Sequence, residues 1–349
     1  MTERRTAPRV TVIMPAYNAE KYLERSVRSV LGQSFRELEL IVSNDGSKDA
    51  TGEILERLAA EDARLRPITA ENGGPAAARN RALDALDADT DYVMFIDSDD
   101  ELLPDAVEYA VAGAESGAEL TVFGFSIVGV DGRARDYSEP ERFYLAEELR
   151  DGFARLYKAN LLNQVWGKLY RASLLRERKA RFQDYRWGED RLFIFDCLEE
   201  PVSVRVLPEC KYRYIMHEGE SLITRYYDKK FAVCLEIDRR VEALSARLGI
   251  GDEADFRYMF AKSVFSCLTN LYSASCRLSG AEKHAVVAEI IGNERVKRRC
   301  RDASGGLPTA VLCAVLRRGS VGLNMRVFRL VALAGERAPR LFLRLKHRK

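Results

Sequence analysis

Acidic side chains gather at a point in the sequence where they could bind a metal ion. Asp97, Asp99 and Asp100 lie within four residues, directly after the apolar run 92–96. Carboxylates this close raise one another's pKa unless a cation neutralises them. Hard oxygen ligands of this kind suit Mg²⁺ or Mn²⁺, which typically also bind phosphate oxygens. The alternative is a solvated turn and helix cap before Pro104, and the motif by itself fits both interpretations equally.

A second acidic pair, Glu189-Asp190, lies among aromatic residues. The rings near it in the sequence are Phe182, Tyr185, Trp187, Phe193 and Phe195. A carboxylate beside rings is partly desolvated, so its pKa rises toward the range useful for a general base. The pair also fits the start of a helix, where the helix dipole favours acidic side chains. The two interpretations are compatible.

Other polar residues stand where apolar runs end. Asp45 could accept hydrogen bonds from a base or a ribose hydroxyl, or could belong to a simple turn, whereas Asp49 is favoured as a helix cap. Tyr17 could stack on a base or pack locally. Arg79 could pair with a phosphate or with a neighbouring carboxylate such as Asp97.

Several motifs of common enzyme classes are missing from the sequence. It contains no Walker A, GxGxxG or GxSxG motif, which disfavours a P-loop ATPase, a classical dinucleotide enzyme and a serine hydrolase. The three histidines are too few for a multi-histidine metal site. Carboxylates therefore remain as the acid–base groups, with His217 as at most a single ligand.

Alternating strands and helices must position these residues. The apolar, β-rich runs of the first hundred residues are Val10–Met14, Leu38–Ser43, Arg66–Thr69 and Tyr92–Ile96. Helical spacing of apolar residues separates them, so repeated strand–loop–helix units predict right-handed crossovers and a parallel sheet. Ligands of such sheets bind outside the carboxyl ends of the strands, and the polar clusters all follow strand ends.

The later part of the sequence has a different pattern. A further strand is expected at Leu120–Val130, and helices between residues 147 and 200, around 165–170 and 187–190. From Tyr227 onward apolar residues recur at helical spacing. We therefore expect a first domain over residues 1–227 and a mostly helical, appended region over 228–349.

The composition is that of a globular protein, 349 residues long and 47% hydrophobic. No apolar stretch reaches the ~18 residues that span a bilayer, and the N-terminus lacks the apolar segment of a signal peptide. The seven cysteines are never spaced CxxC and are absent from the first 196 residues. This favours a reducing cytosol and argues against a disulfide framework or a zinc site.

The net charge of +2 conceals an uneven distribution. Residues 296–349 contain 14 Lys and Arg against 2 Asp and Glu, and residues 1–295 contain 41 against 51. Basic residues alternate with apolar ones in this tail, which is typical of helices that lie on anionic membranes, with Pro339 expected to divide them. The alternative is that the apolar face packs on the body or on a second subunit. Nucleic acid is disfavoured because no binding motif is recognised.

In order and spacing, the motifs between residues 8 and 225 resemble family 2 glycosyltransferases. The matching segments are 12–18, 30–35, 39–49, 72–74 with 78–80, 95–100, 168–170 and 188–193. The resemblance implies an α/β GT-A fold, a Rossmann-like nucleotide-sugar-binding domain. It also implies inverting transfer from a nucleotide sugar, most often a UDP-sugar, with Mn²⁺ or Mg²⁺ as cofactor.

The resemblance also assigns roles to individual residues. The nucleotide-sugar contacts would be Pro15, Ala16, Tyr17, Asn18, Asp45, Asn72, Arg79, Asp97, Ser98 and Lys168. Asp99, with Asp97, would bind the metal through the DxD motif, and His217 resembles a late segment that reaches the metal or diphosphate. Asp190 would be the general base, supported by Glu189. The sequence departs from the family at Asn44, where Asp is common, at Ala82, where Gly is common, and by an extra residue after His217.

The acceptor is less defined than the donor. A membrane-associated tail would suit an enzyme at the inner face of the cell membrane that extends a lipid-linked or polymeric envelope glycan. Homo-oligomerisation is the alternative use of that tail. Two other functions share these features: a non-catalytic nucleotide-sugar-binding or scaffold protein, and a nucleotidyltransferase, which would release pyrophosphate instead of UDP.

Overall fold

The computed structural model describes residues 7–217, 225–301, 303 and 306–337. The chain folds as two compact units, residues 1–218 and 219–349. The expected tail segment 338–349, including Pro339, lies outside the described residues.

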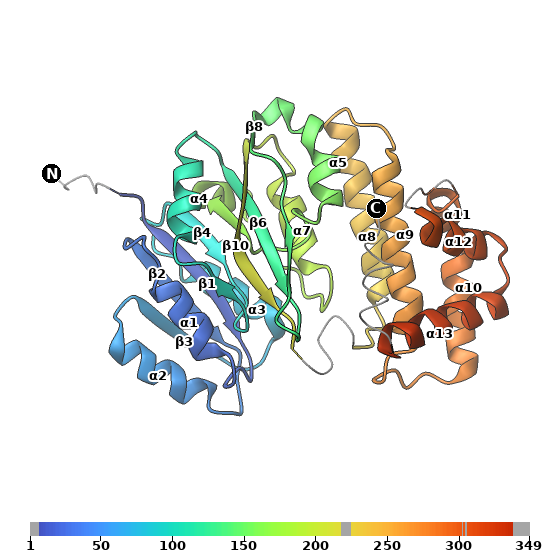
Figure 1. The fold of residues 1–349 in the computed structure, drawn as a ribbon, viewed down its shortest axis with the longest axis horizontal. Helices are drawn as coiled ribbons and strands as arrows, with labels where there is room; N and C mark the ends of the chain where they lie inside the picture. The colour runs from blue at the N-terminus through green and yellow to red at the C-terminus, as the bar shows by residue number, and fades with distance from the viewer. Residues whose placement is uncertain (1–6, 218–224, 302, 304–305, 338–349) are drawn as a thin grey trace. The chain divides into compact units, whose positions relative to one another are not determined.

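Ten strands of the described chain form one mixed sheet in the first unit (Figure 1). The strands are β1 (Val10–Ala16), β2 (Leu38–Asn44), β3 (Leu65–Thr69), β4 (Tyr92–Phe95), β5 (Glu101–Leu102), β6 (Leu120–Val128), β7 (Ala134–Tyr137), β8 (Arg142–Tyr144), β9 (Lys168–Arg171) and β10 (Val204–Ile215). Their order is β3-β2-β1-β4-β9-β6-β10-β5, with β7 on β6 and β8 on β10. The predicted parallel arrangement of the first four strands is confirmed, since β1 runs parallel to both β2 and β4 and β2 runs parallel to β3.

The residues around 165–170 differ from the helix that the sequence predicted. Lys168–Arg171 form strand β9, which runs antiparallel between β4 and β6. Residues 165–170 are buried on both faces, so their sequence shows no alternation of apolar and polar residues. Hydrophobic periodicity cannot distinguish a buried strand from a buried helix in such a run. This strand brings the segment before it to the same sheet edge as the end of β4.

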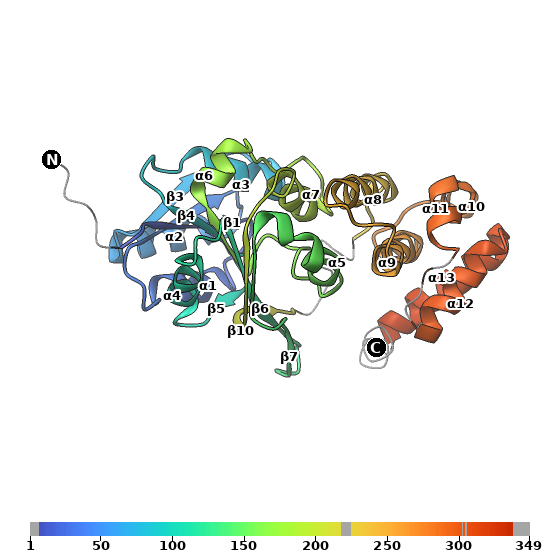
Figure 2. The same ribbon diagram turned by 90° about the horizontal axis from the view of Figure 1, so that it is seen from above.

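Helices cover both faces of the sheet. They are α1 (Leu23–Leu31), α2 (Thr51–Glu61), α3 (Gly74–Asp84), α4 (Ala106–Ala114), the 3₁₀ turn η1 (Ala146–Glu148), α5 (Arg150–Lys158), α6 (Ala172–Glu177) and α7 (Glu189–Cys197). Figure 2 shows α3 and α6 on one face and α1 and α4 on the other. The central strands are apolar on both sides because both faces are covered, and Val12, Ile13 and Met14 of β1 have no exposed surface.

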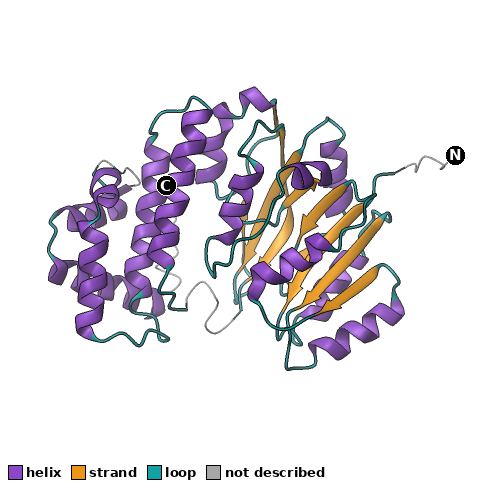
Figure 3. Cartoon of the chain, turned by 180° about the vertical axis from the view of Figure 1, so that it is seen from behind, coloured by secondary structure: helices purple, strands orange, loops and turns teal. Residues whose placement is uncertain are grey.

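The described part of the second unit contains helices only (Figure 3). They are α8 (Lys230–Arg247), α9 (Ala254–Asn270), α10 (Gly280–Gly292), α11 (Glu294–Arg299), α12 (Gly306–Arg317) and α13 (Val321–Arg337). This confirms the helical pattern predicted from Tyr227 onward. Among the described residues, no helix combines the length and the apolar character that crossing a membrane requires.

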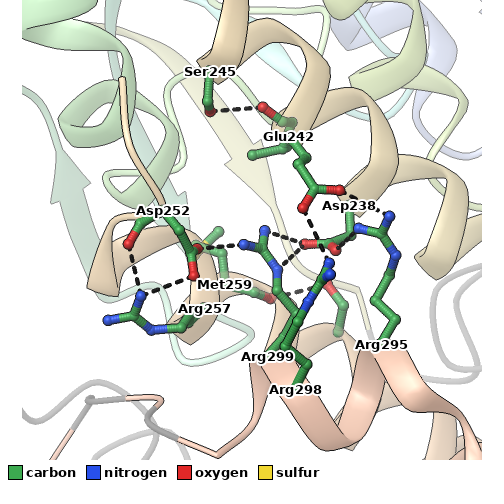
Figure 4. A network of polar contacts seen from close by, with 11 residues as sticks. Asp238, Glu242, Ser245, Asp252, Arg257, Met259, Arg295, Arg298 and Arg299 are labelled. Carbon is green, nitrogen blue, oxygen red and sulfur yellow. Dashed lines mark hydrogen bonds and ion pairs between the residues drawn. The ribbon is translucent and has the colours of Figure 1, made fainter. Parts of the chain in front are cut away.

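A buried ion network joins α11 to α8 (Figure 4). Asp238 accepts hydrogen bonds from Arg295 at 2.7 Å and from Arg299 at 2.6 Å, and the side chains of Asp238 and Arg299 are each 3% exposed. Glu242 pairs with Arg295 at 2.9 Å and with Arg298 at 3.1 Å, and Arg299 also pairs with Asp252. Arg298 and Arg299 belong to the basic tail as the sequence defined it. The first residues of that tail are therefore bound to acidic side chains of the helical unit.

Candidate active site

The polar clusters meet at the edge of the sheet where β1, β2 and β4 end. The turn after β1 is joined to the turn after β2, because the Asn18 amide donates to Ser47 Oγ at 3.0 Å and the Lys48 amide donates to Asn18 Oδ1 at 2.8 Å. Asn44, where the family often has Asp, accepts from the Ser47 amide at 3.1 Å. Pro15 and Ala16 are the last residues of β1. Tyr17 follows them with 51% of its surface exposed.

Asp45 is engaged by the chain itself. Its carboxylate accepts from the amides of Gly73 at 2.9 Å and Gly74 at 2.7 Å, and it pairs with Arg81. The residue is 2% exposed. The sequence favoured a ligand contact for Asp45, but in the structure its side chain fixes the start of α3, where negative charge is favourable. Asn72 donates to the Asp45 carbonyl at 3.0 Å and is exposed.

Arg79 lies at the centre of the acidic site. Its guanidinium donates to Asp97 at 2.8 Å, to Asp190 at 3.2 Å and to Glu189 at 3.4 Å, and its side chain is 5% exposed. Burial alone would lower the pKa of Arg79, but the three carboxylates raise it above its ordinary value. The sequence suggested either a phosphate or a carboxylate as the partner of Arg79, and in the structure its partners are carboxylates. One cation thus joins the turn after β4 to the first turn of α7.

The acidic pair on α7 has the electrostatics expected of a proton acceptor. Burial, followed by the charge of Asp190, raises the pKa of Glu189 from 4.5 to about 7. Burial also raises the pKa of Asp190, and the charge of Arg79 opposes this. Gly188, with φ of 85°, precedes the pair and turns the chain into the helix. The aromatic setting predicted from the sequence includes Phe182, which lies under the Arg79 guanidinium at 5.2 Å from the ring centroid.

Asp99 and His217 face each other beside this group. Their Oδ2 and Nε2 atoms are 3.7 Å apart, and the imidazole stacks on the Tyr22 ring with centroids 3.8 Å apart. Within the described chain, His217 Nε2 is buried and has no hydrogen-bond partner. Burial and the charge of Asp97 raise the pKa of Asp99 to about 6. The structure thus brings His217 to Asp99, although no described cluster gathers three or more His, Cys, Asp or Glu side chains around a metal position.

Asp100 has a different role from its neighbours. It has no exposed surface, and it accepts from Tyr212 Oη at 2.6 Å and from the Ile215 amide at 2.8 Å. Tyr212 Oη in turn accepts from the Asp97 amide at 3.2 Å. Asp100 therefore anchors the turn 97–100, which includes the half-buried Ser98, to β10. Sequence reasoning missed Tyr212 and Tyr22 because a tyrosine within a strand or before a helix gives no signal of a distant partner.

Lys168 is not placed to meet a nucleotide sugar. It has no exposed surface, and its ammonium group donates to the carbonyls of Gln164 at 2.6 Å and Trp166 at 3.2 Å. Burial lowers its pKa to about 7, an effect opposed by the charge of Asp190. The donor contact expected of Lys168 from the family resemblance is thus replaced by contacts to the chain's own backbone.

Comparison with known proteins identifies the domain that carries this site. Residues 11–179 match the model of glycosyl transferase family 2. The first unit carries a family 2 glycosyltransferase domain. The crystal structure of residues 1–349 of S. aureus TarS in complex with UDP-GlcNAc has the same fold, with a TM-score of 0.64 and 22% sequence identity over 94% of this chain and 92% of that one. The predicted GT-A fold with additional C-terminal helices is thereby confirmed.

Two curated relatives come from bacteria. Glycosyltransferase GlyA of Streptococcus pneumoniae is 29% identical over 311 residues, which are 82% of this chain and 41% of that protein. The GalNAc(5)-diNAcBac-PP-undecaprenol beta-1,3-glucosyltransferase of Campylobacter jejuni is 35% identical over 127 residues, 36% of this chain and 40% of that protein. The chain therefore spans less than half the length of either relative.

Proposed function

We propose that this protein is an inverting glycosyltransferase that moves a sugar from a nucleotide sugar to an acceptor hydroxyl. The observation that carries the proposal is the junction at Arg79, which joins Asp97 of the DxD turn to Glu189 and Asp190. Two acidic motifs that lie far apart in the sequence thereby form one site in a family 2 domain. A general base and a site for a charged donor are both needed for this reaction.

Asp190 is the proposed general base. One of its oxygens accepts from Arg79 and the other from the Val165 amide at 3.4 Å, so each keeps a lone pair for a further proton. Asp190 would take the proton of the acceptor hydroxyl while that oxygen attacks the anomeric carbon from the face opposite the leaving nucleotide. Direct displacement inverts the configuration. Glu189, with its pKa near 7, shares the charge of Arg79 and so adjusts the basicity of the pair.

Asp99 and His217 fit a divalent cation. A buried imidazole nitrogen without a hydrogen-bond partner in the described chain and a carboxylate 3.7 Å away are a donor pair for Mn²⁺ or Mg²⁺. Such ions commonly use one or two protein ligands and complete their shell with substrate phosphates and water. When bound, the cation supplies positive charge beside the departing diphosphate.

The donor class follows from what the related structures hold. TarS was crystallised with UDP-GlcNAc and with UDP, so we favour a UDP-sugar as donor for this chain. The name of the Campylobacter relative specifies an undecaprenol-linked acceptor, which supports a lipid-linked or polymeric envelope glycan here. Tyr17, exposed beside the turn at Asn18, is the proposed platform for the base.

The C-terminal helices are proposed to hold the enzyme at the inner face of the membrane. Arg298 and Arg299 are already paired within the helical unit, whereas α13 exposes Arg326, Arg329 and Leu330. Leu330 is 66% exposed, so cationic and apolar surface occur together on this helix. The double variant R326E/R329E should lose binding to phosphatidylglycerol vesicles. A change in subunit association with unchanged vesicle binding would instead favour packing on a second copy.

Replacement of the base tests the proposed reaction. After a panel of nucleotide sugars has been screened for thermal stabilisation with Mn²⁺, Asp190→Asn should lower transfer at least about a hundredfold while donor affinity stays within twofold. Asp196→Asn, the same change later on α7, is the matched control and should retain activity. Normal turnover by a folded Asp190→Asn variant would contradict the role of Asp190, and release of pyrophosphate instead of UDP would indicate a nucleotidyltransferase.

A further inference from the structure

A short segment beside Asp190 is largely buried although it has no regular secondary structure. Residues 163–167 lie between α5 and β9 as a series of bends, and residues 165–170 are nevertheless all buried. Buried backbone groups need hydrogen-bond partners. Here the partners of three consecutive carbonyls are side chains of the strand that follows.

Two side chains of β9 bind these carbonyls. The Lys168 ammonium donates to Gln164 O at 2.6 Å and to Trp166 O at 3.2 Å. The Tyr170 hydroxyl donates to the carbonyl between them, Val165 O, at 3.1 Å. Lys168 and Tyr170 have no exposed surface, so water does not compete for these bonds. The segment is therefore fixed on one side at three successive peptide units.

The other side of the same segment faces the proposed base. The Val165 amide donates to Asp190 Oδ2 at 3.4 Å. Gly167 completes the geometry, because its φ of +68° is readily adopted by glycine and its carbonyl accepts from the Phe123 amide at 3.0 Å. Hydrogen bonds from β9 and β6 thus determine where the Val165 amide lies relative to Asp190.

We propose that Lys168 and Tyr170 are positioning residues for the transfer reaction, which fix the backbone of residues 164–166 so that the Val165 amide orients the Asp190 carboxylate toward the acceptor hydroxyl. This inference rests on the proposed function, in which Asp190 is the general base. Lys168 and Tyr170 themselves touch neither donor nor acceptor in this scheme. They act through the backbone of residues 164–166.

The presence of a lysine at this buried position supports a specific role. A buried ammonium group is disfavoured by desolvation, which lowers the pKa of Lys168 to about 7. An apolar side chain of similar length would avoid that penalty but would leave the carbonyls of Gln164 and Trp166 without donors. The charges that face Asp190 come from four elements: Arg79 of α3, Asp97 after β4, Lys168 of β9 and Glu189 of α7.

Tyr170→Phe tests the proposal with the smallest change. It removes one hydroxyl and keeps the ring, so kcat should fall roughly tenfold to a hundredfold while KM for the donor stays within twofold. A weaker hydrogen bond from the displaced Val165 amide to the charged Asp190 carboxylate should also move the acidic limb of the kcat profile to higher pH. Tyr92→Phe, which removes a hydroxyl from β4, should retain the kcat and the pH profile of the unmodified chain.

Lys168→Met should give the same pattern with a larger loss of kcat. A variant that only packs poorly would show a lower melting temperature with an unmoved acidic limb, and that result from Tyr170→Phe would overturn the proposal. Normal kcat in Tyr170→Phe would overturn it as well. If Lys168→Met does not fold, Tyr170→Phe alone decides.

A second measurement does not depend on activity. Hydrogen exchange of the Val165 amide, followed by NMR in the unliganded full chain, should accelerate about threefold to tenfold in Tyr170→Phe and remain unchanged in Tyr92→Phe. If the unmodified chain transfers no sugar, the proposed function fails, while this exchange result still tests whether Tyr170 fixes the backbone of residues 164–166. Unchanged exchange in Tyr170→Phe would overturn the role of the tyrosine.

Discussion

Removal of the Arg79 charge should destabilise the first unit strongly, and more so at alkaline than at acidic pH. Arg79→Met keeps a side chain of similar length but leaves Asp97, Asp190 and Glu189 facing one another without a cation. The three donor–acceptor distances of 2.8, 3.2 and 3.4 Å in the native site show that all three carboxylates lose a direct partner. Removing one partner of a buried ion pair is costly because the remaining charges stay desolvated.

The size of the effect can be worked out from these contacts. With charge centres about 4.5 Å apart and an effective dielectric constant near 20, each pair contributes roughly 4 kcal/mol before desolvation is subtracted. The loss is limited because a carboxylate that has lost its cation can bind a proton instead. Each unit by which a carboxylate pKa rises costs about 1.4 kcal/mol, and the pKa of Glu189 is already about 7 in the unmodified chain. We therefore expect a net loss of about 3 kcal/mol in the free energy of unfolding at pH 8, in the range measured for broken buried pairs.

The sign of the pH dependence follows from the same contacts. Arg79 lowers the pKa values of Glu189 and Asp190, so without it both carboxylates are protonated over a wider pH range. The deficit of the variant is greatest where the carboxylates would be charged, at pH 8, and becomes smaller as the pH falls below about 7. At pH 5.5 we expect less than half of the loss seen at pH 8.

Tryptophan fluorescence isolates the relevant unit in this experiment. The two tryptophans of the chain, Trp166 and Trp187, both belong to residues 1–218, so urea unfolding followed by their emission reports the first unit. Arg57→Met is the matched control: Arg57 also pairs with two carboxylates, at 2.6 and 3.0 Å, but is 48% exposed. Its loss of unfolding free energy should be far smaller than that of Arg79→Met, because exposed ion pairs contribute little. Equal losses for the two variants, or a loss at Arg79 that is the same at pH 8 and pH 5.5, would refute the reasoning.

Three further predictions concern other groups. The unfolding free energy of the unmodified chain should fall by up to roughly 3 kcal/mol between pH 4.5 and 7, because folded Glu189 keeps a proton that the unfolded chain releases, and urea titrations of Glu189→Gln should lack this fall. Asp238→Asn should destabilise the helical unit by about 3 kcal/mol, visible by far-UV circular dichroism, and a loss below about 1 kcal/mol would show that the buried network is dispensable. Asp99→Asn and His217→Ala should each remove the Mn²⁺-dependent gain in UDP affinity measured by calorimetry, and an undiminished gain in both would exclude them as ligands.

The charge pattern of the sequence acquires a more specific meaning from the second unit. The sequence alone presents residues 296–349 as one basic appendage. In the structure Arg298 and Arg299 neutralise Glu242 and Asp238 of α8, so part of the positive charge stabilises the helical unit. Arg326 and Arg329 of α13, by contrast, are exposed. Pairing of this kind is invisible in a charge count because the partners are 56 and 61 residues apart.

The sequence predicted where the acidic motifs lie in the fold better than it predicted the contacts of individual side chains. Strand ends are marked by local residue patterns, so the convergence of Asp97 and Asp99 on one sheet edge could be predicted, and helix-start chemistry placed Glu189 and Asp190 on the first turn of α7. Asp45 and Lys168 show the limit, since both were expected to meet a ligand. In the structure Asp45 binds the amides of Gly73 and Gly74, which lie 28 and 29 residues away, and Lys168 binds the nearby carbonyls of Gln164 and Trp166 in a segment without regular secondary structure. Neither set of contacts follows from a local sequence pattern.

The sequence by itself therefore determined the family, the parallel βαβ core and the types of side chain at its ligand-binding edge. These features follow from short-range sequence patterns. Only the tertiary structure decided that Arg79 joins the two acidic motifs, that His217 lies beside Asp99, and that β9 inserts antiparallel between β4 and β6. The physical reason is the same in each case. A buried charge or backbone group must find a partner, and which partner it finds is set by the geometry of the whole sheet.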